Sequence, residues 1–453
     1  MLSLTLCAIA AAAGFLAGRQ SLVRGIGVVV TVGYFYGILR ANLIEPASHF
    51  IFDACALGFY VSQLTRTVGA DERFRSRHVK AWAVLLTLWP LLLLAVPLQD
   101  PLVQLVGFRG HVFLLPFLVF GARLTPRQWY SLAIWYGALN LVTLGFAALE
   151  FFVGLERFYP RSAVTELIYL SRDVAETAFR IPATFTSAHA YGGTMVTSIP
   201  LLLGAWEQRR HARADTLALL GGLAAAILGV FLAAARVNAV ILFLLLIAAL
   251  PALVVRMNFL RATSLAMIVV GIGWVVSREE RLQRFETLRD TDVVQNRIAG
   301  SVNDNFLEAA RKHPFGNGLG GGGTSLPYFL QNQTANSTLV VENHYAYVLL
   351  EQGIPGLALW VGFLVWVLMP GGGRRHSPWR TALRCTRVLV AAFLAVGMIG
   401  IGLFVSVPQS ALLLLGMGWL AAREPRRQFA TMPQVTRAPS APLGLPSPQR
   451  ATT

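Results

Sequence analysis

The stretch "VVENHYAYVLLEQGIPGLALWVGFLVWVLM", residues 340–369, decides the fold, because it runs from a polar segment directly into a long apolar one. A helix of about 20 apolar residues crosses a bilayer, and the segment 345–369 is long enough. His344 stands at its entrance, and Gly353, Pro355 and Gly356 interrupt it. The stretch therefore predicts a membrane-spanning helix that is broken or kinked near its start.

The rest of the chain repeats this apolar pattern. Of 453 residues, 55% are hydrophobic and only 13% are charged, and the mean hydropathy is +0.59. The charged fraction is about half that of a soluble domain. We therefore expect an all-α polytopic membrane protein with about 12–13 transmembrane helices, at 2–18, 24–39, 47–65, 81–97, 108–122, 131–154, 187–206, 216–235, 237–255, 262–277, 345–369, 388–407 and 409–422.

The arginine-rich segments between these helices predict the orientation. If the helices alternate, all of these segments fall on one side, which the positive-inside rule makes the cytoplasm. The segments are 66–80, 123–128, 207–215, 256–262 and 371–387. Two longer segments, 155–186 and 278–343, then form external loops, the second with a short helix at 302–312. We expect residues 1–422 to form one integral membrane domain and 423–453 a disordered cytoplasmic tail.

Two classes of ligand receive no support from the sequence. The net charge of +16 does not indicate nucleic acid, because the basic residues cluster in short loops between apolar segments. The three cysteines, Cys7, Cys55 and Cys385, form no CxxC or Cys/His group, so neither a disulfide framework nor a zinc site is predicted. We expect no metal and no cofactor. Asp53 and Glu150 lie in or near apolar segments without a partner that the sequence identifies.

His344 is the first candidate for catalysis. An imidazole that titrates near neutrality can accept a proton from a hydroxyl group. Glu351 lies seven residues further on, which places it on the same face of a helix. Histidines at a membrane interface are more often structural, so this alternative stays open.

Three arginines are candidates for anion binding. Arg236 stands between two apolar runs, Arg180 precedes a predicted helix, and Arg297 lies in the longer external loop. A guanidinium group suits a bidentate grip on phosphate, although an arginine such as Arg236 can also anchor a helix by snorkelling. The segment "KHPFGNGLGGGG", 312–323, allows its backbone to approach a ligand closely, but it lacks the Lys-Ser/Thr step of a P-loop.

Four stretches, taken in order, resemble the O-antigen ligase and polymerase family of bacterial envelope proteins. They are "RIPATFTSAHAYGG" (180–193), "AARVNAVILF" (234–243), "NRIAGSVNDNFLEAARKHPFGNGLGGG" (296–322) and "ENHYAYVLLEQGIPGLALW" (342–360). The resemblance covers roughly residues 80–420, and the last two stretches are the most specific.

The resemblance implies a reaction. A glycan is transferred from undecaprenyl diphosphate to a sugar hydroxyl, on lipid A-core or on another glycan, at the outer (periplasmic) face of the inner membrane. No metal or nucleotide sugar takes part. His344 takes the position of the base, and Arg180, Arg236, Arg297 and Glu351 are expected to bind substrate. A lipid-linked glycan transporter or flippase is the alternative. Ligase and polymerase are not separated by these motifs.

Overall fold

The computed structural model describes residues 1–170, 179–208, 212–256, 305–322, 343–369, 377–398, 400 and 406–423. Its elements in these segments are helices, so the all-α prediction is confirmed for the described part of the chain. Six of these helices are long and apolar enough to cross a membrane: Leu2–Gln20, Leu22–Asn42, Pro101–Arg123, Pro126–Val153, Arg213–Leu232 and His344–Leu368. The expected helix at 262–277, most of the loop 278–343 and the tail from 424 lie outside the described residues, and the count of about 12–13 crossings stays a prediction.

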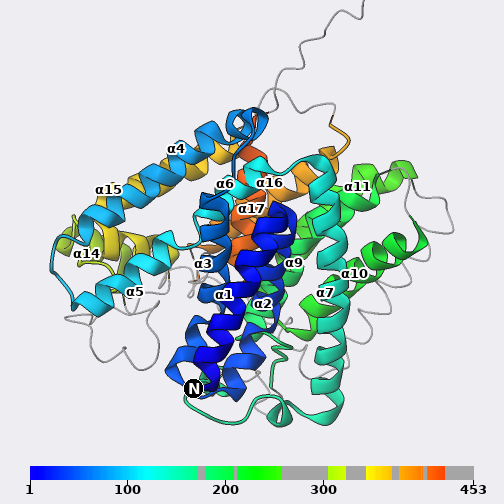
Figure 1. Ribbon diagram of the computed structural model, residues 1–453, viewed down its shortest axis with the longest axis horizontal. Coiled ribbons are helices and arrows are strands. Elements are labelled where there is room, and N and C mark those ends of the chain that lie inside the picture. Colours follow the sequence, from blue (N-terminus) through cyan, green and yellow to red (C-terminus); the bar gives the residue numbers. More distant parts are fainter. Residues whose placement is uncertain are drawn as a thin grey trace, which may run out of the picture.

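In chain order, the helices are α1 (Leu2–Gln20), α2 (Leu22–Asn42), η1 (Pro46–Phe50), α3 (Ile51–Leu64), α4 (Ala70–Leu93), α5 (Pro101–Val112), α6 (Pro116–Arg123), α7 (Pro126–Val153), η2 (Leu155–Arg157), α8 (Glu166–Leu170), α9 (Ala188–Trp206), α10 (Arg213–Leu232), α11 (Arg236–Arg256), α14 (Asn305–Lys312), α15 (His344–Leu368), α16 (Arg380–Val396) and α17 (Gln409–Ala421). Figure 1 shows α4 and α15 side by side, with α14 and α5 next to them, beside a main bundle of the other helices.

Small residues let the helices of the bundle approach closely. A Cβ atom on Gly14 of α1 would lie 2.1 Å from the carbonyl oxygen of Cys55 on α3, and one on Gly58 would lie 2.0 Å from the carbonyl oxygen of Ala11. Contacts of this kind, in which glycine brings two helix backbones together, are typical of helix packing in membranes. The close α1–α3 pair therefore agrees with the apolar composition of the sequence.

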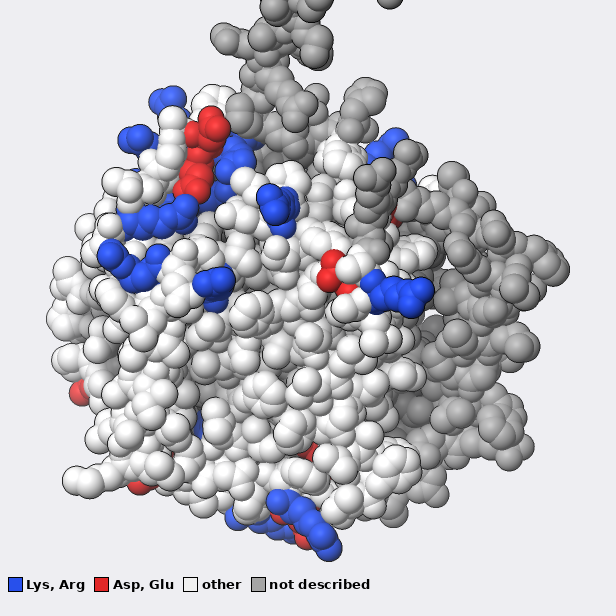
Figure 2. Space-filling view, turned by 45° about the vertical axis from the view of Figure 1, so that its right-hand side comes forward, with Lys and Arg blue, Asp and Glu red and all other residues white. Residues whose placement is uncertain are grey.

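The molecular surface has a broad uncharged zone. Figure 2 shows lysine and arginine side chains gathered towards the top and bottom of the molecule, with a band nearly free of charge between them. Large hydrophobic side chains are exposed on several helices, among them Leu16, Leu88 and Phe152. An uncharged zone with exposed large hydrophobic side chains is what a lipid-facing surface requires.

Several helix boundaries differ from those expected. The helix expected at 388–407 ends at Val396. α4 begins at Ala70, inside the segment 66–80 that was expected to be a loop, and α16 begins at Arg380, inside 371–387. Arginine and lysine are good helix formers, so a helix continues beyond its apolar part. The helix expected at 108–122 begins earlier, at Pro101, where the Asp100 side chain accepts a hydrogen bond from the Leu102 amide. It is interrupted between Val112 and Pro116.

The two isolated acidic residues have partners in the folded chain. Asp53 accepts two hydrogen bonds from Arg109, from Nε at 2.6 Å and from Nη2 at 2.8 Å. Glu150 accepts one from the backbone amide of Ala183 at 2.9 Å. Both contacts join segments that are distant in sequence. Both oxygens of the Asp53 carboxylate are engaged, whereas the Glu150 Oε1 atom is buried without a hydrogen-bond partner.

Candidate functional site

The start of α15 is fixed by a side-chain cap. The Asn343 Oδ1 atom accepts hydrogen bonds from the amides of Tyr345 at 2.8 Å and Ala346 at 3.3 Å, which satisfies donors that a helix start leaves free. His344 follows as the first helical residue and is only 6% exposed. Its backbone amide donates to the carbonyl oxygen of Gly397, just beyond α16, at 2.8 Å. His344 is therefore a buried residue in a fixed position.

The break predicted in this helix is present. Gly353 has φ 72° and ψ −175°, so α15 consists of two helical parts. The segment 313–322 packs against the break. The Asn317 amide donates to the carbonyl oxygen of Leu350 at 2.6 Å, and the Ile354 amide donates to that of Pro314 at 2.8 Å. These bonds use backbone groups that the broken helix leaves without a helical partner.

The carboxylate of Glu351 lies at the centre of this contact. The residue is 0% exposed. Its Oε2 atom is 2.7 Å from the His111 Nε2 atom of α5, and its Oε1 atom accepts from the Gly322 amide at 3.1 Å. The His111 ring stacks on Tyr347 with a centroid distance of 5.1 Å. The His344 ring lies 5.8 Å from the same tyrosine ring.

His111 was not singled out in the sequence. It lies in "GFRGHVF", residues 107–113, within a stretch expected to span the membrane. An ionisable residue in such a stretch usually faces protein or water, and this was the signal that could have identified it. The structure thus gathers two histidines and a glutamate around Tyr347, from α5 and the first part of α15.

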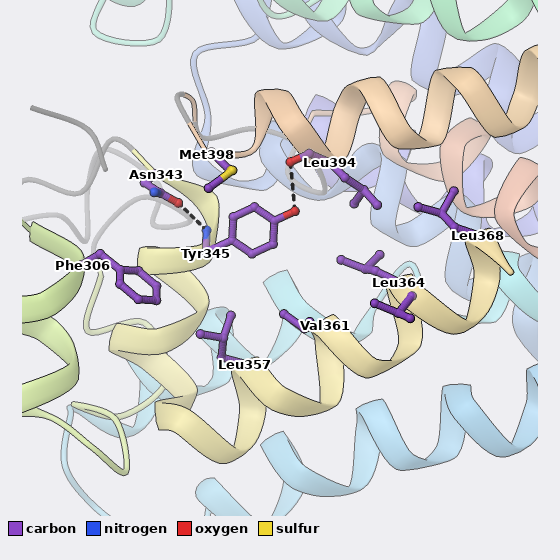
Figure 3. Close-up of a pocket in the computed structure, with 10 residues that line it drawn as sticks. Phe306, Asn343, Tyr345, Leu357, Val361, Leu364, Leu368, Leu394 and Met398 are labelled. Carbon is purple, nitrogen blue, oxygen red and sulfur yellow. Dashed lines mark hydrogen bonds between the residues drawn. The ribbon is translucent and has the colours of Figure 1, made fainter. Parts of the chain in front are cut away.

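An apolar cavity is lined by the two chain neighbours of His344, Asn343 and Tyr345. Its volume is about 440 Å³. Figure 3 shows Asn343 and Tyr345 near one end of it and Leu364 and Leu368 towards the other. The Tyr345 hydroxyl donates to the carbonyl oxygen of Leu394 on α16 at 2.9 Å. The lining is Phe306, Asn343, Tyr345, Leu357, Val361, Leu364, Val365, Leu368, Leu394 and Met398. A cavity with a polar head and an apolar wall suits an amphipathic ligand.

Arg180 lies against the start of α11, in a second group of polar residues that also contains His189 and Arg236. Arg180 is 3% exposed. Its Nη1 atom is 3.0 Å from His189 Nε2 of α9, and its Nη2 atom donates to the carbonyl oxygen of Ala234 at 3.3 Å. Ala234 has a left-handed φ of 46°. Arg236 begins α11 two residues later and is half-buried. His189 was not anticipated either.

The segment that carries Arg180 is held from two sides. The Tyr159 hydroxyl donates to the carbonyl oxygens of Ala183 at 2.6 Å and Phe185 at 2.8 Å. Burial, and to a lesser extent the nearby Glu150, raises the pKa of Tyr159 well above its ordinary value. The phenol therefore remains a neutral donor. Together with the Glu150–Ala183 bond, this contact fixes the path of the chain after Arg180.

No family model and no curated protein matches this chain. His344 and Glu351 lie in the same part of α15, and Arg180 lies beside the start of α11 where Arg236 is found. Arg297 lies outside the described residues. Among the described residues, no group of three or more His, Cys, Asp or Glu side chains could hold a metal ion.

Proposed function

We propose that this chain is a membrane glycosyltransferase. It transfers a glycan from undecaprenyl diphosphate to a sugar hydroxyl, on lipid A-core or on another glycan, at the periplasmic face of the bacterial inner membrane. The observation that carries the proposal is an apolar cavity lined by Asn343 and Tyr345, the chain neighbours on either side of the buried His344. A lipid-linked donor needs both features, because its chain is apolar and its reacting end is polar.

The proposed roles follow from charge and geometry. His344 accepts the proton of the acceptor hydroxyl as the new glycosidic bond forms. The bond between the glycan and the diphosphate breaks at the same centre, and negative charge develops on the leaving diphosphate. Arginine side chains stabilise such charge. Arg180 and Arg236, which lie near each other at the start of α11, and Arg297 take this role.

The surface supports a multi-pass membrane location. The uncharged band between two charged zones (Figure 2) and the six long apolar helices fit a bilayer. The arginine-rich segments then face the cytoplasm. His344 and the segment 313–322 belong to the opposite side, where the glycan donor presents its sugars.

The test is glycan transfer by the purified protein. The protein is reconstituted in vesicles with an undecaprenyl-diphosphate-linked glycan and a lipid A-core or glycan acceptor, and products are separated by gel electrophoresis. We expect transfer by the wild type that persists in EDTA, since the proposed roles need no metal. Movement of the donor across the vesicle membrane without any transfer would instead identify a flippase. Complementation of a ligase-null and of a polymerase-null strain then shows which acceptor is used.

A further inference from the structure

One face of α5 lies directly against the glycine segment 313–322. Val103, Gly107 and His111 are four residues apart and share that face. A Cβ atom on Gly107 would lie 2.1 Å from the Gly320 amide nitrogen, so only glycine allows this approach. Gly320 in turn has a left-handed φ of 79°, and a Cβ atom there would lie 2.5 Å from the Val103 carbonyl oxygen. The contact is therefore made between two backbones.

Glu351 joins this contact to α15. One carboxylate oxygen is 2.7 Å from His111 and the other accepts from the Gly322 amide at 3.1 Å. A buried carboxylate whose two oxygens are already engaged by the protein is better suited to holding structure than to binding a substrate. This geometry gives Glu351 a different role from the substrate contact that its sequence position suggested.

Tyr347 connects this contact to His344. His111 stacks on Tyr347, and the ring of Tyr347 lies 5.8 Å from that of His344. Glu351, Tyr347 and His344 all belong to the part of α15 that precedes the break at Gly353. A shift of His111 or Glu351 therefore moves the side chains that surround the proposed base.

We propose that His111 and Glu351 are positioning residues for the transfer reaction. With the Gly322 amide they form a clasp, which fixes the glycine segment between α5 and α15 and keeps the His344 ring in place through Tyr347. The role in transfer rests on the function proposed above, whereas the clasp itself is a structural contact that is tested without any substrate.

The first experiment measures the clasp by thiol labelling. Leu319, which is 0% exposed under the clasp, is replaced by cysteine in the full chain, and the chain without this change gives the background from Cys7, Cys55 and Cys385. We expect slow labelling of the otherwise unchanged Leu319→Cys protein. Glu351→Ala should raise the labelling rate about tenfold or more, as expected for the loss of a charge-assisted hydrogen bond. Unchanged protection would overturn the clasp, whatever the enzyme does.

Conservative variants distinguish a positioning role of His111 and Glu351 from a requirement for a charge on either side chain. Glu351→Gln keeps an acceptor for the Gly322 amide and gains an N–H group for His111, and His111→Gln keeps a nitrogen near the Nε2 position. Both should retain protection of Leu319→Cys and transfer within about threefold, whereas Glu351→Ala and His111→Ala should lower turnover about 10²-fold, as a misplaced catalytic group does. If Glu351→Gln is as inactive as Glu351→Ala, the positioning role is wrong.

A substitution at the backbone contact between α5 and the glycine segment tests the clasp in a second way, because it leaves the side chains of His111 and Glu351 unchanged. Gly107→Ala should force the glycine segment away from α5, expose Leu319→Cys and lower turnover. The matched control is Gly145→Ala, since a Cβ atom at Gly145 meets nothing within 4 Å. Monodisperse elution on gel filtration confirms that each variant is folded. A folded Gly107→Ala protein with full protection and full turnover would contradict the proposal.

Discussion

At the scale of single residues, the decisive group is the imidazole of His344. We expect His344→Ala to lower turnover by about 10²–10⁴-fold, the range for loss of a general base. Binding of the lipid diphosphate should change little, because the base contacts the acceptor hydroxyl and not the diphosphate. The measurement is glycan transfer alongside donor binding, with His78→Ala on α4 as the control. A fully active His344→Ala protein would end the proposed mechanism.

The arginines should respond to the shape of their side chains as well as to charge. Lysine keeps the charge of Arg180 or Arg236 but loses the planar fork. We expect Arg180→Lys, Arg236→Lys and Arg297→Lys to weaken binding of the lipid diphosphate by about 1.5–3 kcal/mol for each lost charged hydrogen bond. The defect at Arg180 should be the mildest.

Titration calorimetry or a filter-binding assay with undecaprenyl diphosphate measures this binding for each arginine variant. An anchoring role predicts a different result for Arg236, since snorkelling needs only charge and length. Unchanged binding and full transfer by Arg236→Lys would return that residue to the anchor role.

The site was predictable in part at this scale. His344 and Glu351 stood out because ionisable residues are costly at the edge of an apolar segment, and the structure places both inside the protein. His111, the partner of Glu351, was missed because the contact joins residues 240 positions apart. No local spacing in the sequence reports such a pair. His189 was missed for a related reason, since its partner Arg180 lies in an irregular segment.

At the scale of elements, α15 depends on its break. A side chain at Gly353 would be strained at φ 72°, and its Cβ atom would lie 2.4 Å from the carbonyl carbon of Phe315. We expect Gly353→Ala to lower the free energy of unfolding by about 1–3 kcal/mol. Gly362→Ala in the same helix is the control, because its Cβ atom would meet Trp82 at an ordinary 3.5 Å. Thermal unfolding in detergent compares the two, and equal melting temperatures would contradict the role of the break.

The apolar cavity along α15 provides a second prediction for this element. Val361 lines the cavity, so Val361→Trp should fill part of it and weaken donor binding. Ala358→Trp places the same bulk on an exposed position of the helix and should leave binding unchanged. The measurement is the KM for lipid-linked donors of long and short polyprenyl chain. If the two tryptophan variants behave alike, the cavity is not the site of the lipid chain.

Hydropathy predicted the elements better than their ends. Most of the expected helices were found within a few residues, since about 20 apolar residues in a row leave few alternatives. The charged extensions of α4 and α16 were not expected, because hydropathy marks only the apolar part of a helix. The helix expected at 302–312 is present as Asn305–Lys312, and its end at His313-Pro314 follows from the effect of proline on the residue before it.

At the scale of the whole molecule, the packing of the helices could not be read from the sequence. The contact between the segment 313–322 and the break in α15 requires two distant stretches to meet. The glycines of the segment 313–322 and Gly353 of α15 allow the two backbones to approach closely, and this role can be recognised only when both segments are seen together. Composition indicates a membrane protein, but the partners of each helix depend on the shapes of their surfaces.

The last prediction concerns the orientation of the whole chain. The positive-inside rule places the segments 66–80, 207–215 and 371–387 in the cytoplasm and 278–343 outside. Arg311 of α14 and Arg380 at the start of α16 are both exposed, and they should lie on opposite sides of the membrane. An impermeant thiol reagent should therefore label Arg311→Cys in intact spheroplasts and Arg380→Cys only after permeabilisation. The reverse pattern would place His344 on the cytoplasmic side, where the acceptor glycans of the proposed reaction are not found, and would remove both the orientation and the function that depends on it.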